Sequence, residues 1–482
     1  MVDFRPVAYV IGRILIVLAI LMMAPAVIDW RAGLENGTIF MQTAVLTGVV
    51  GGAMALATGN ALGGSLDTRQ AYVLTAGIWI GVPVFAALPF MMGAPGLVFT
   101  DAYFEAVSGL TTTGASVIAK VEELPTGTIL WRGMLNWLGG LGIAFIAMIF
   151  LPLMRVGGMQ FFRTEGFDTF GKALPRATDI ARQLLWVYAG LTVICVIVYA
   201  AVGMTTLDAV VHGLTTISTG GFSTSDQSFG RYRGAAEYAG ALFMFLGSLP
   251  YIRYVQLVNG SATPLWRDSQ TRAYFRWLMG AVLIVWIWRI NTSGMAWEPA
   301  FREALFNLTS IMSSTGYGTG SFGGWGGFML VVAFVIGIVG ACSGSSAAGL
   351  SVFRVQVAMA ALRREIRRIT NPSSIDPIKY EGRTVGEDVL NALIMFISGF
   401  ILILGVMSVA MSLMGVDALS SLFAVWTSIG NIGYGFGPLV AETGTFIDYP
   451  QGAIVIMTLC MILGRLGLLT ILVLVLPRFW RS

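Results

Sequence analysis

Charged side chains are scarce in this chain of 482 residues, because Asp, Glu, Lys and Arg together make up only 11% of it. Apolar residues make up 56%, and the mean hydropathy is +0.79. A water-soluble globular domain could not cover its surface with so few charges, so the composition excludes that class. We therefore expect an integral membrane protein.

Histidine and cysteine are also scarce, which limits the available chemistry. The one histidine, His212, excludes a multi-histidine metal site and leaves little for proton-relay or triad chemistry. The three cysteines, Cys195, Cys342 and Cys460, stand in apolar or small-residue stretches without a CxxC pair, so we interpret them as reduced and structural. No GxGxxG fingerprint or P-loop occurs in a soluble segment, so we expect this chain to bind no nucleotide.

Long apolar stretches, by contrast, are abundant, and a helix that crosses a bilayer needs roughly 20 mostly apolar residues. Ten stretches qualify, near residues 7–28, 40–63, 71–92, 131–154, 183–203, 238–259, 274–290, 326–350, 389–414 and 452–476. The first ends in A-P-A at 24–26, which resembles a signal-peptidase site. Because Arg13 interrupts its apolar run, we expect an uncleaved first helix, with cleavage as the alternative.

Basic residues are concentrated in a few short loops, although the net charge is only +4. If the N-terminus is cytoplasmic, most of the 29 Lys and Arg residues fall near the chain ends and in the loops at 155–182, 253–276 and 354–383. Short loops that stay in the cytoplasm carry an excess of Lys and Arg. The sequence therefore predicts a multi-pass protein with both termini in the cytoplasm.

Four stretches rich in Gly, Thr and Ser lie between the apolar segments, at residues 108–117, 213–225, 308–323 and 426–438. They are too short and polar to span a bilayer, so we interpret them as re-entrant. From residue 71 onward the order helix, re-entrant stretch, helix occurs four times, and such a period of roughly 100 residues indicates internal duplication. We align the four stretches on Gly114, Gly220, Gly316 and Gly433.

This pattern predicts five units along the chain: an N-terminal helix pair at 1–66 and four repeats at 67–160, 161–262, 263–370 and 371–482. Extended backbone at membrane depth is permitted only where it is buried in protein or lines a wet pathway. Carbonyl oxygens from four sides can replace the hydration shell of a monovalent cation, and glycine permits the backbone angles that this requires. The sequence therefore predicts four pore loops around one ion pathway.

Several motifs make this pattern more specific. They are S-T-G-Y-G-T-G at 314–320, N-I-G-Y-G-F-G at 431–437, R-A-T-D-I-A-R-Q at 176–183, T-G-G-F-S at 219–223 and E-G-R-T-V-G at 381–386. With the four unequal repeats they resemble the Trk/Ktr/HKT superfamily, and the two extra N-terminal helices resemble its TrkH/TrkG-type potassium uptake subunits.

The resemblance implies an all-α integral membrane protein of about ten transmembrane helices in the bacterial inner membrane. It implies K⁺ as the transported ion, a homodimer, and control by a cytoplasmic nucleotide-binding ring similar to TrkA. We expect no nucleic-acid partner.

The resemblance also implies three layers of filter residues. The deepest is assigned to Thr112, Ser218, Ser314 and Asn431, the next to Thr113, Thr219, Thr315 and Ile432, and the last to the four aligned glycines. Ala115 and Gly221 then stand where Tyr317 and Tyr434 stand in the later repeats, so the outer filter is asymmetric. This asymmetry leaves a Na⁺-permeable or poorly selective transporter as the alternative to a potassium-selective one.

The second helix of repeat three is expected to be broken, because residues 336–350 are rich in small and hydroxylated side chains. In the proteins that the chain resembles, this segment is an intramembrane gating loop under the filter. The resemblance implies a hinged barrier formed by Gly337, Gly340, Gly344, Ser345, Ser346 and Gly349. The alternative is a tight helix-packing face.

Arg465 lies near the middle of the last predicted span, too far from either membrane face to reach water by extending its side chain. The resemblance implies a place at the cytoplasmic side of the filter, where a fixed positive charge would promote the exit of a resident cation. A structural salt bridge is the alternative.

Two further features leave more than one interpretation open. The basic cluster at 363–368 is either an orientation signal against anionic lipid or a docking site for a partner. Ser345 and His212 both lie in membrane segments, and a serine with a histidine can support nucleophilic catalysis, so an intramembrane serine protease is an alternative. A protease does not explain the fourfold repeat, so we predict that the chain is not an enzyme.

Overall fold

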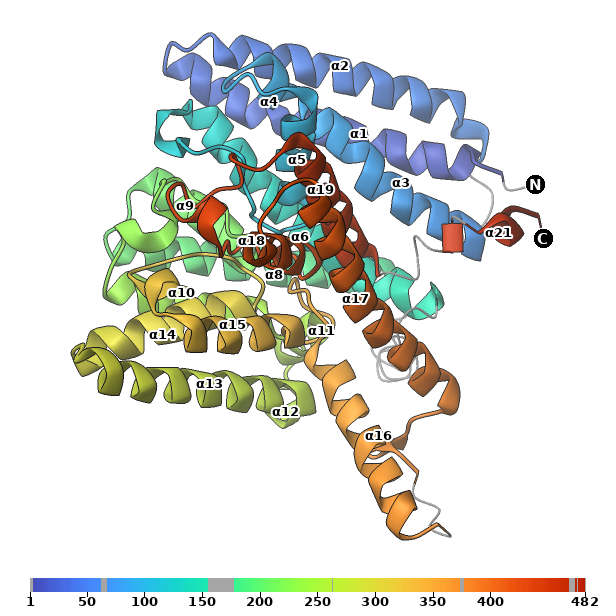
Figure 1. Ribbon diagram of the computed structural model, residues 1–482. Helices are drawn as coiled ribbons and strands as arrows, with labels where there is room; N and C mark the ends of the chain where they lie inside the picture. Colours follow the sequence, from blue (N-terminus) through green and yellow to red (C-terminus); the bar gives the residue numbers. More distant parts are fainter. Residues whose placement is uncertain are drawn as a thin grey trace.

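A computed structural model describes residues 3–61, 67–154, 177–261, 263–372, 377–467, 473–474 and 476–481. These residues are helical nearly throughout (Figure 1). The described strands are β1 (Lys379–Tyr380) and β2 (Arg383–Thr384), which form a small antiparallel hairpin with Lys379 opposite Thr384. The predicted all-α fold class is confirmed.

Two antiparallel helices stand outside the repeats at one edge of the molecule, α1 (Arg5–Arg31) and α2 (Asn36–Ala57) (Figure 1). Their backbones approach closely at Gly12, since a Cβ added there would lie only 2.7 Å from the carbonyl oxygen of Gly51. The absence of a side chain at Gly12 permits this approach. The buried carboxylate of Asp29 joins this pair to repeat one, since it accepts hydrogen bonds from Asn36 Nδ2 (2.6 Å) and the Gly127 amide (2.6 Å).

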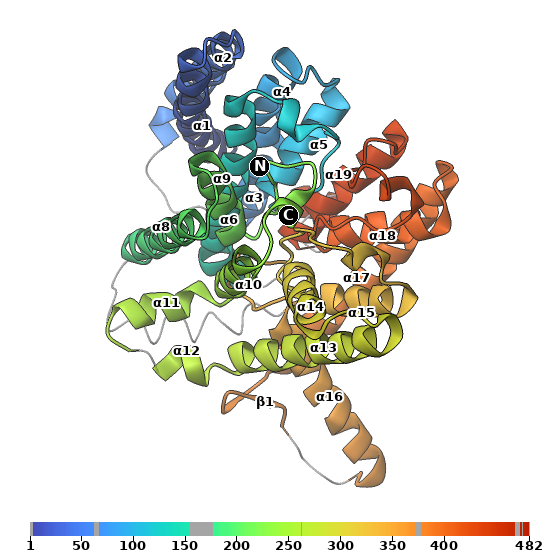
Figure 2. The ribbon, with the colours of Figure 1, turned by 90° about the vertical axis from the view of Figure 1, so that its left-hand side faces the viewer.

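Each repeat has an outer helix, a short pore helix, an extended return and an inner helix, and the four repeats are arranged around one centre (Figure 2). The outer helices are α3 (Thr68–Ala86) continued by α4 (Leu88–Met92), α8 (Ala177–Ala201), α13 (Ser269–Ser293) and α17 (Glu387–Leu413). The pore helices are α5 (Phe99–Leu110), α9 (Thr206–Ile217), α14 (Trp297–Met312) and α18 (Ala418–Ile429). The inner helices are α6 (Thr126–Met154), α10 (Ala235–Gly247) with α11 (Tyr251–Val258), α15 (Gly327–Val339) and α19 (Gln451–Leu466).

Shorter elements connect or follow these helices. They are α12 (Thr263–Arg267), α16 (Val352–Thr370), α21 (Pro477–Arg481), and the 3₁₀ turns Gly59–Ala61, Val121–Glu123, Ser228–Arg231, Phe322–Gly324 and Pro438–Val440. The predicted repeat boundaries at 66, 160 and 262, and most of the loop at 155–182, lie outside the described residues.

Six helices among the described residues are long and apolar enough to cross a bilayer, and the α10–α11 pair makes a seventh if it is counted as one span. The six are Arg5–Arg31, Asn36–Ala57, Arg69–Met92, Ala181–Ala201, Ser269–Ser293 and Glu387–Leu413. The chain is therefore a multi-pass membrane protein, and the predicted number of ten spans stays a prediction.

Three inner helices differ from simple spans. The stretch at 238–259 was expected to be one helix, but α10 and α11 meet at an angle of 91° next to Pro250, which lacks the amide hydrogen that a continuous helix needs. The stretch expected at 452–476 ends early, because α19 stops at Leu466 before Gly467, whose φ is +73°. In repeat three the expected break is present, since α15 ends at Val339 and α16 begins at Val352.

Candidate functional site: four loops around one axis

The four pore helices end in the same backbone conformation. Directly after each C-cap stands a non-glycine residue in the left-handed region: Thr112 (φ 50°), Thr219 (52°), Ser314 (56°) and Asn431 (47°). Two residues later each loop has a glycine that is also left-handed: Gly114 (77°), Gly221 (74°), Gly316 (85°) and Gly433 (80°). This conformation is costly for side chains other than glycine, so its fourfold occurrence indicates one shared structural requirement.

This geometry corrects the alignment of the second loop by one residue. Thr219, Gly220 and Gly221 correspond to Thr112, Thr113 and Gly114. In both loops the amide of the middle residue donates a hydrogen bond to a carbonyl oxygen of the pore helix. The sequence alignment had placed Ser218, Thr219 and Gly220 in the three layers. Ser218 is instead the C-cap of α9, and Gly221 is the shared glycine. Two adjacent glycines made the register ambiguous from sequence.

The four glycines close a ring of loops. A Cβ on each would collide with the backbone carbonyl oxygen of the residue before the equivalent glycine in the next loop. These pairs are Gly114 with Gly220, Gly221 with Thr315, Gly316 with Ile432, and Gly433 with Thr113. Because the order of contacts runs through repeats one to four and returns to one, the loops surround a single axis. Any side chain at these positions would force neighbouring backbones apart.

The position after each shared glycine is aromatic in three loops. It is occupied by Ala115, Phe222, Tyr317 and Tyr434. Each aromatic packs on the pore helix of the preceding repeat: the Tyr434 hydroxyl lies 3.1 Å from Asn307 Oδ1, and the Tyr317 hydroxyl lies 3.3 Å from Thr216 Oγ1. In the corrected alignment, Phe222 rather than Gly221 is the residue of loop two that corresponds to Tyr317 and Tyr434. Ala115 is then the one residue at this position that is not aromatic.

A polar residue nine positions before the shared glycine holds the return limb of the first three loops. Glu105 accepts from the Val117 amide (3.2 Å), and Asn307 Oδ1 accepts from the Thr319 amide (3.1 Å). In the second loop His212 Nε2 lies 3.1 Å from Ser223 Oγ. The sequence analysis did not assign this shared role to these residues, although their equal spacing from the glycine was a usable signal.

His212 therefore has a structural role in loop two. Its Nδ1 lies 2.9 Å from the Asp208 carbonyl oxygen, so both ring nitrogens have partners on its own repeat. Ser345 donates instead to the Cys342 carbonyl oxygen at 2.7 Å. The nucleophile and base that a protease needs must lie within hydrogen-bond reach of each other, and these two residues bond elsewhere.

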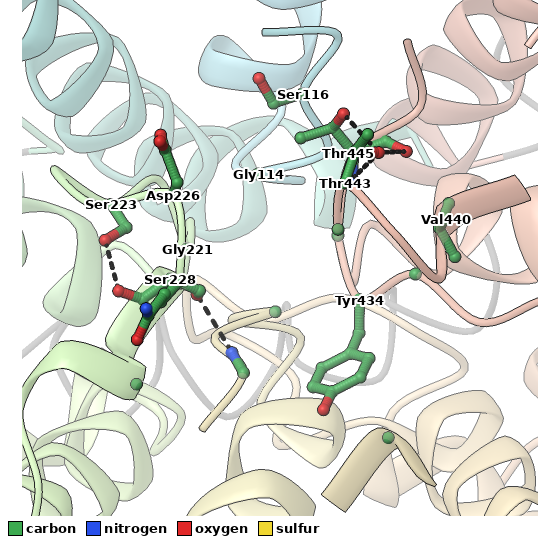
Figure 3. A pocket seen from close by; sticks show the side chains of 18 of the residues that line it. Gly114, Ser116, Gly221, Ser223, Asp226, Ser228, Tyr434, Val440, Thr443 and Thr445 are labelled. Atoms are coloured by element: carbon green, nitrogen blue, oxygen red, sulfur yellow. Dashed lines mark hydrogen bonds between the residues drawn. The ribbon is translucent and has the colours of Figure 1, made fainter. Parts of the chain in front are cut away.

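An open cavity of about 890 Å³ lies on one side of the four loops and is lined by all four shared glycines. Figure 3 shows Gly114, Gly221 and Tyr434 around it, on loops from repeats one, two and four. Both signs of charge line its wall, from Arg132, Asp226, Arg233 and Glu442. Among the residues that the structure describes, no group of three or more His, Cys, Asp or Glu is arranged to hold a metal ion.

The segment between α15 and α16 folds back against the four pore loops. The Ala348 amide donates to Ser314 Oγ at 2.8 Å, which ties this segment to the residue of repeat three that is predicted for the deepest filter layer. Gly344 accepts from the Tyr251 amide at 2.9 Å, and the Tyr251 hydroxyl lies 2.8 Å from Ser346 Oγ. The bend between α10 and α11 thus provides the surface on which this segment rests.

The six predicted gate residues have different surroundings. Gly340 and Gly349 lie against one another, with φ of +68° and +86°, and close the base of the segment. Gly344 is also left-handed (φ 80°) but has open space around it. Gly337 lies within α15, where a Cβ would collide with the Trp426 ring, so this glycine has the helix-packing role named as the alternative.

Arg465 lies in the last turn of α19 rather than in the middle of a long span. Its Nη2 donates to Thr112 Oγ1, a residue predicted for the deepest filter layer, and its buried Nε has no hydrogen-bond partner. Within the described residues no carboxylate forms an ion pair with it. The nearby Asn431 donates to Thr113 Oγ1 at 2.9 Å, so several polar side chains meet where loops one and four adjoin.

Comparison with known proteins agrees with this geometry. The sequence profile of the TrkH family, described as cation transport protein, matches residues 36–482. The chain is 37% identical to the Trk system potassium uptake protein TrkI of Halomonas elongata over 87% of this chain and 85% of that protein. It is 32% identical to the Trk system potassium uptake protein TrkH of Escherichia coli, covering 99% of this chain and all of that protein.

A solved structure is similar along the whole chain. The crystal structure of the potassium transporter TrkH from Vibrio parahaemolyticus superimposes with a TM-score of 0.90 at 28% identity, and the match covers all of both chains. The profile match spans most of the chain, and the fourfold loops occupy its centre. The chain therefore belongs to the TrkH family of cation transport proteins.

Proposed function

We propose that this chain is the ion-conducting subunit of a potassium uptake system of the bacterial inner membrane. The observation that carries the proposal is the closed ring of four loops, each with the same pair of left-handed residues. Such a ring can offer backbone carbonyl oxygens in place of the hydration shell of K⁺. The pore helices direct the negative ends of their dipoles toward it, which favours a cation. K⁺ is the cargo, and this chain binds no nucleotide itself.

The corrected second loop favours K⁺ over Na⁺ as the preferred ion. A Na⁺-permeable transporter was motivated by two non-aromatic positions after the shared glycine, and only Ala115 remains. The aromatic side chains of the other three loops brace the ring against the preceding pore helix. A braced ring resists shrinking around the smaller Na⁺ ion, which is one source of discrimination.

Below the ring, the segment at 340–351 acts as a gate in this proposal. Ions that have passed the filter wait above it, and Arg465 at the base of the filter raises the energy of a resident cation. The contact between Ala348 and Ser314 supports this role, since it ties the segment to the filter itself. Displacement of the segment toward the cytoplasm would open the pathway.

Control of the gate is assigned to a partner. We propose a homodimer whose cytoplasmic face binds a nucleotide-binding ring similar to TrkA, with both termini of this chain in the cytoplasm. The exposed arginines at the end of α16, among them Arg363 and Arg368, suit either docking of that ring or contact with anionic lipid. Helix α16 continues directly from the gate segment, so a force on this helix reaches the gate.

Complementation tests the function. Expression of the chain, together with a TrkA-like partner, is expected to restore growth of a bacterial strain that lacks potassium uptake at low external K⁺. Expression without the partner is expected to give weaker growth. If neither restores growth while the protein is present in the membrane, the proposed function is wrong.

Replacement of the charge below the filter gives a second test. Arg465→Gln keeps a hydrogen-bond donor for Thr112 but removes the positive charge, so a cation rests more stably at this layer. We expect ⁸⁶Rb⁺ uptake at limiting external Rb⁺ to rise at least about tenfold, because a charge that close in a partly desolvated site changes the ion's energy by more than about 1.4 kcal/mol. The matched control is Arg478→Gln, which removes an arginine outside the filter. If Arg465→Gln takes up ⁸⁶Rb⁺ at the wild-type rate and other ions block its uptake as they block the wild type, the proposed role of Arg465 in the pore is wrong.

A further inference from the structure

We infer that Arg132 is a positioning residue that fixes the distance between the filter loops of repeats one and two, and thereby sets the discrimination between K⁺ and Na⁺. The inference rests on the proposed function and deepens it. Arg132 lies on α6, the inner helix of repeat one, and its side chain is only 3% exposed. Its guanidinium contacts both loops.

The contacts of this guanidinium use all three of its nitrogens. Nε pairs with Glu105 Oε1 at 2.8 Å, on the pore helix of repeat one. Nη2 donates to Ser116 Oγ at 3.0 Å, and Nη1 donates to the Ser223 carbonyl oxygen at 3.3 Å. Ser116 and Ser223 are equivalent residues, each two positions after the shared glycine. One rigid side chain therefore joins the same point of two neighbouring loops.

Three more contacts hold the same junction together. The guanidinium carbon of Arg132 lies 4.2 Å from the centre of the Phe222 ring, which is the aromatic of loop two. One turn along α6, Asn136 Nδ2 donates to the Gly109 carbonyl oxygen at 2.9 Å, and Asn136 Oδ1 accepts from the Phe222 amide at 3.2 Å. Arg132 and Asn136 share a helix face because they are four residues apart. Together they form a polar connection between pore helix one and loop two.

Loop two lacks the polar link to the preceding pore helix that loops three and four have. Tyr317 and Tyr434 reach the preceding pore helix with a hydroxyl, whereas Phe222 has no hydroxyl to donate. Arg132 supplies the missing polar link from the opposite direction. Ala115 adds no aromatic brace of its own, so loop one also depends on Ser116 and Glu105 for its position.

The chemistry of the pair separates a geometric role from a charge effect. Glu105 is fully buried, so a cation must remain near it to avoid an unpaired buried charge. Lysine provides that cation, but its single ammonium lacks the planar fork that reaches three acceptors at once. Arg132→Lys therefore keeps the charge and loses the link between the loops, whereas Arg132→Gln loses both.

The experiment measures reversal potentials of the full-length protein in planar bilayers with K⁺ on one side and Na⁺ on the other. We expect the K⁺/Na⁺ permeability ratio to fall about tenfold in both Arg132→Lys and Arg132→Gln, as for the loss of one hydrogen bond to a charged group. Lys120→Gln is the matched control, because it removes a cation from an exposed pair with Glu123 on the same repeat, and its ratio is expected to equal the wild type.

The other possible results contradict either the inference about Arg132 or the proposed function. A lysine variant with the wild-type ratio would overturn the inference, because charge alone would then suffice. A lysine variant that never reaches the membrane would also overturn it and assign Arg132 to folding. A wild-type current whose reversal potential ignores the K⁺ gradient would instead refute the proposed function, so the two failures are distinguishable.

Discussion

Gly221→Ala is expected to abolish potassium uptake, with a fall of more than tenfold in the ⁸⁶Rb⁺ uptake rate per molecule in the membrane. Gly221 has a φ of +74°, where a side chain costs roughly 1–2 kcal/mol on its own. The added Cβ would also collide with the Thr315 carbonyl oxygen, which belongs to the backbone of loop three. Backbone cannot rotate away as a side chain can, so the ring has to widen. A widened ring no longer surrounds a dehydrated K⁺ ion.

Two alanine substitutions in the same repeat serve as controls. Gly190 lies within α8 with nothing near its missing Cβ, so Gly190→Ala is expected to transport as the wild type does. At Gly220 the added Cβ would meet the side chain of Asn136 rather than backbone, and φ is not left-handed. Gly220→Ala should therefore reduce uptake less than Gly221→Ala. The reverse order would contradict the register of the second loop.

The alignment of the second loop shows which part of the candidate site could be predicted from the sequence and which part could not. Four stretches with hydroxylated residues and glycine, spaced roughly 100 residues apart, predicted four loops around one pathway, and three of the loops were aligned correctly. In T-G-G-F-S either glycine satisfies the pattern. The left-handed φ of Thr219 and Gly221 selects the second glycine. The sequence offered one signal for the same register, because Phe222 then aligns with Tyr317 and Tyr434.

The inner helices show a different limit. Small residues at 336–350 predicted the break after α15, because glycine and serine hold an apolar helix weakly. The bend at Pro250 and the end of α19 at Leu466 fall in stretches whose hydropathy stays high, so a count of apolar residues passes over them. Hydropathy reports whether a segment belongs in a bilayer, not whether its backbone is one continuous helix.

Polar residues inside the protein were also hard to predict. Glu105, Arg132 and Asn136 are individually unremarkable in the sequence, and their partners lie on other elements, so only the fold brings them together. Such buried polar groups must be hydrogen-bonded, and each of these three residues has a hydrogen bond to a pore loop. The same reasoning now identifies which residues hold the ring in place.

Gly340→Ala is expected to open the pathway, with a rise of about tenfold in resting ⁸⁶Rb⁺ flux into proteoliposomes, equal to about 1.4 kcal/mol of lost closure. Gly340 begins the proposed gate segment with a φ of +68°, and an added Cβ would collide with the Ala348 carbonyl oxygen. Leu350 and Ser351 donate to the carbonyl oxygens of Ile338 and Val339, at 3.0 and 2.9 Å. These bonds close the segment at its base, so a side chain at 340 has to push it away from the filter.

Gly344→Ala is the matched control, because it isolates the collision from the backbone strain. Gly344 has a similar left-handed φ of +80° but nothing within 4 Å of its missing Cβ. Its alanine variant suffers only the strain and should raise the flux less than Gly340→Ala. A partner ring that closes the wild-type pore should fail to close the Gly340→Ala pore, because the segment cannot return beneath Ser314. Resting flux at or below the wild-type value in Gly340→Ala would show that this segment does not block the ions.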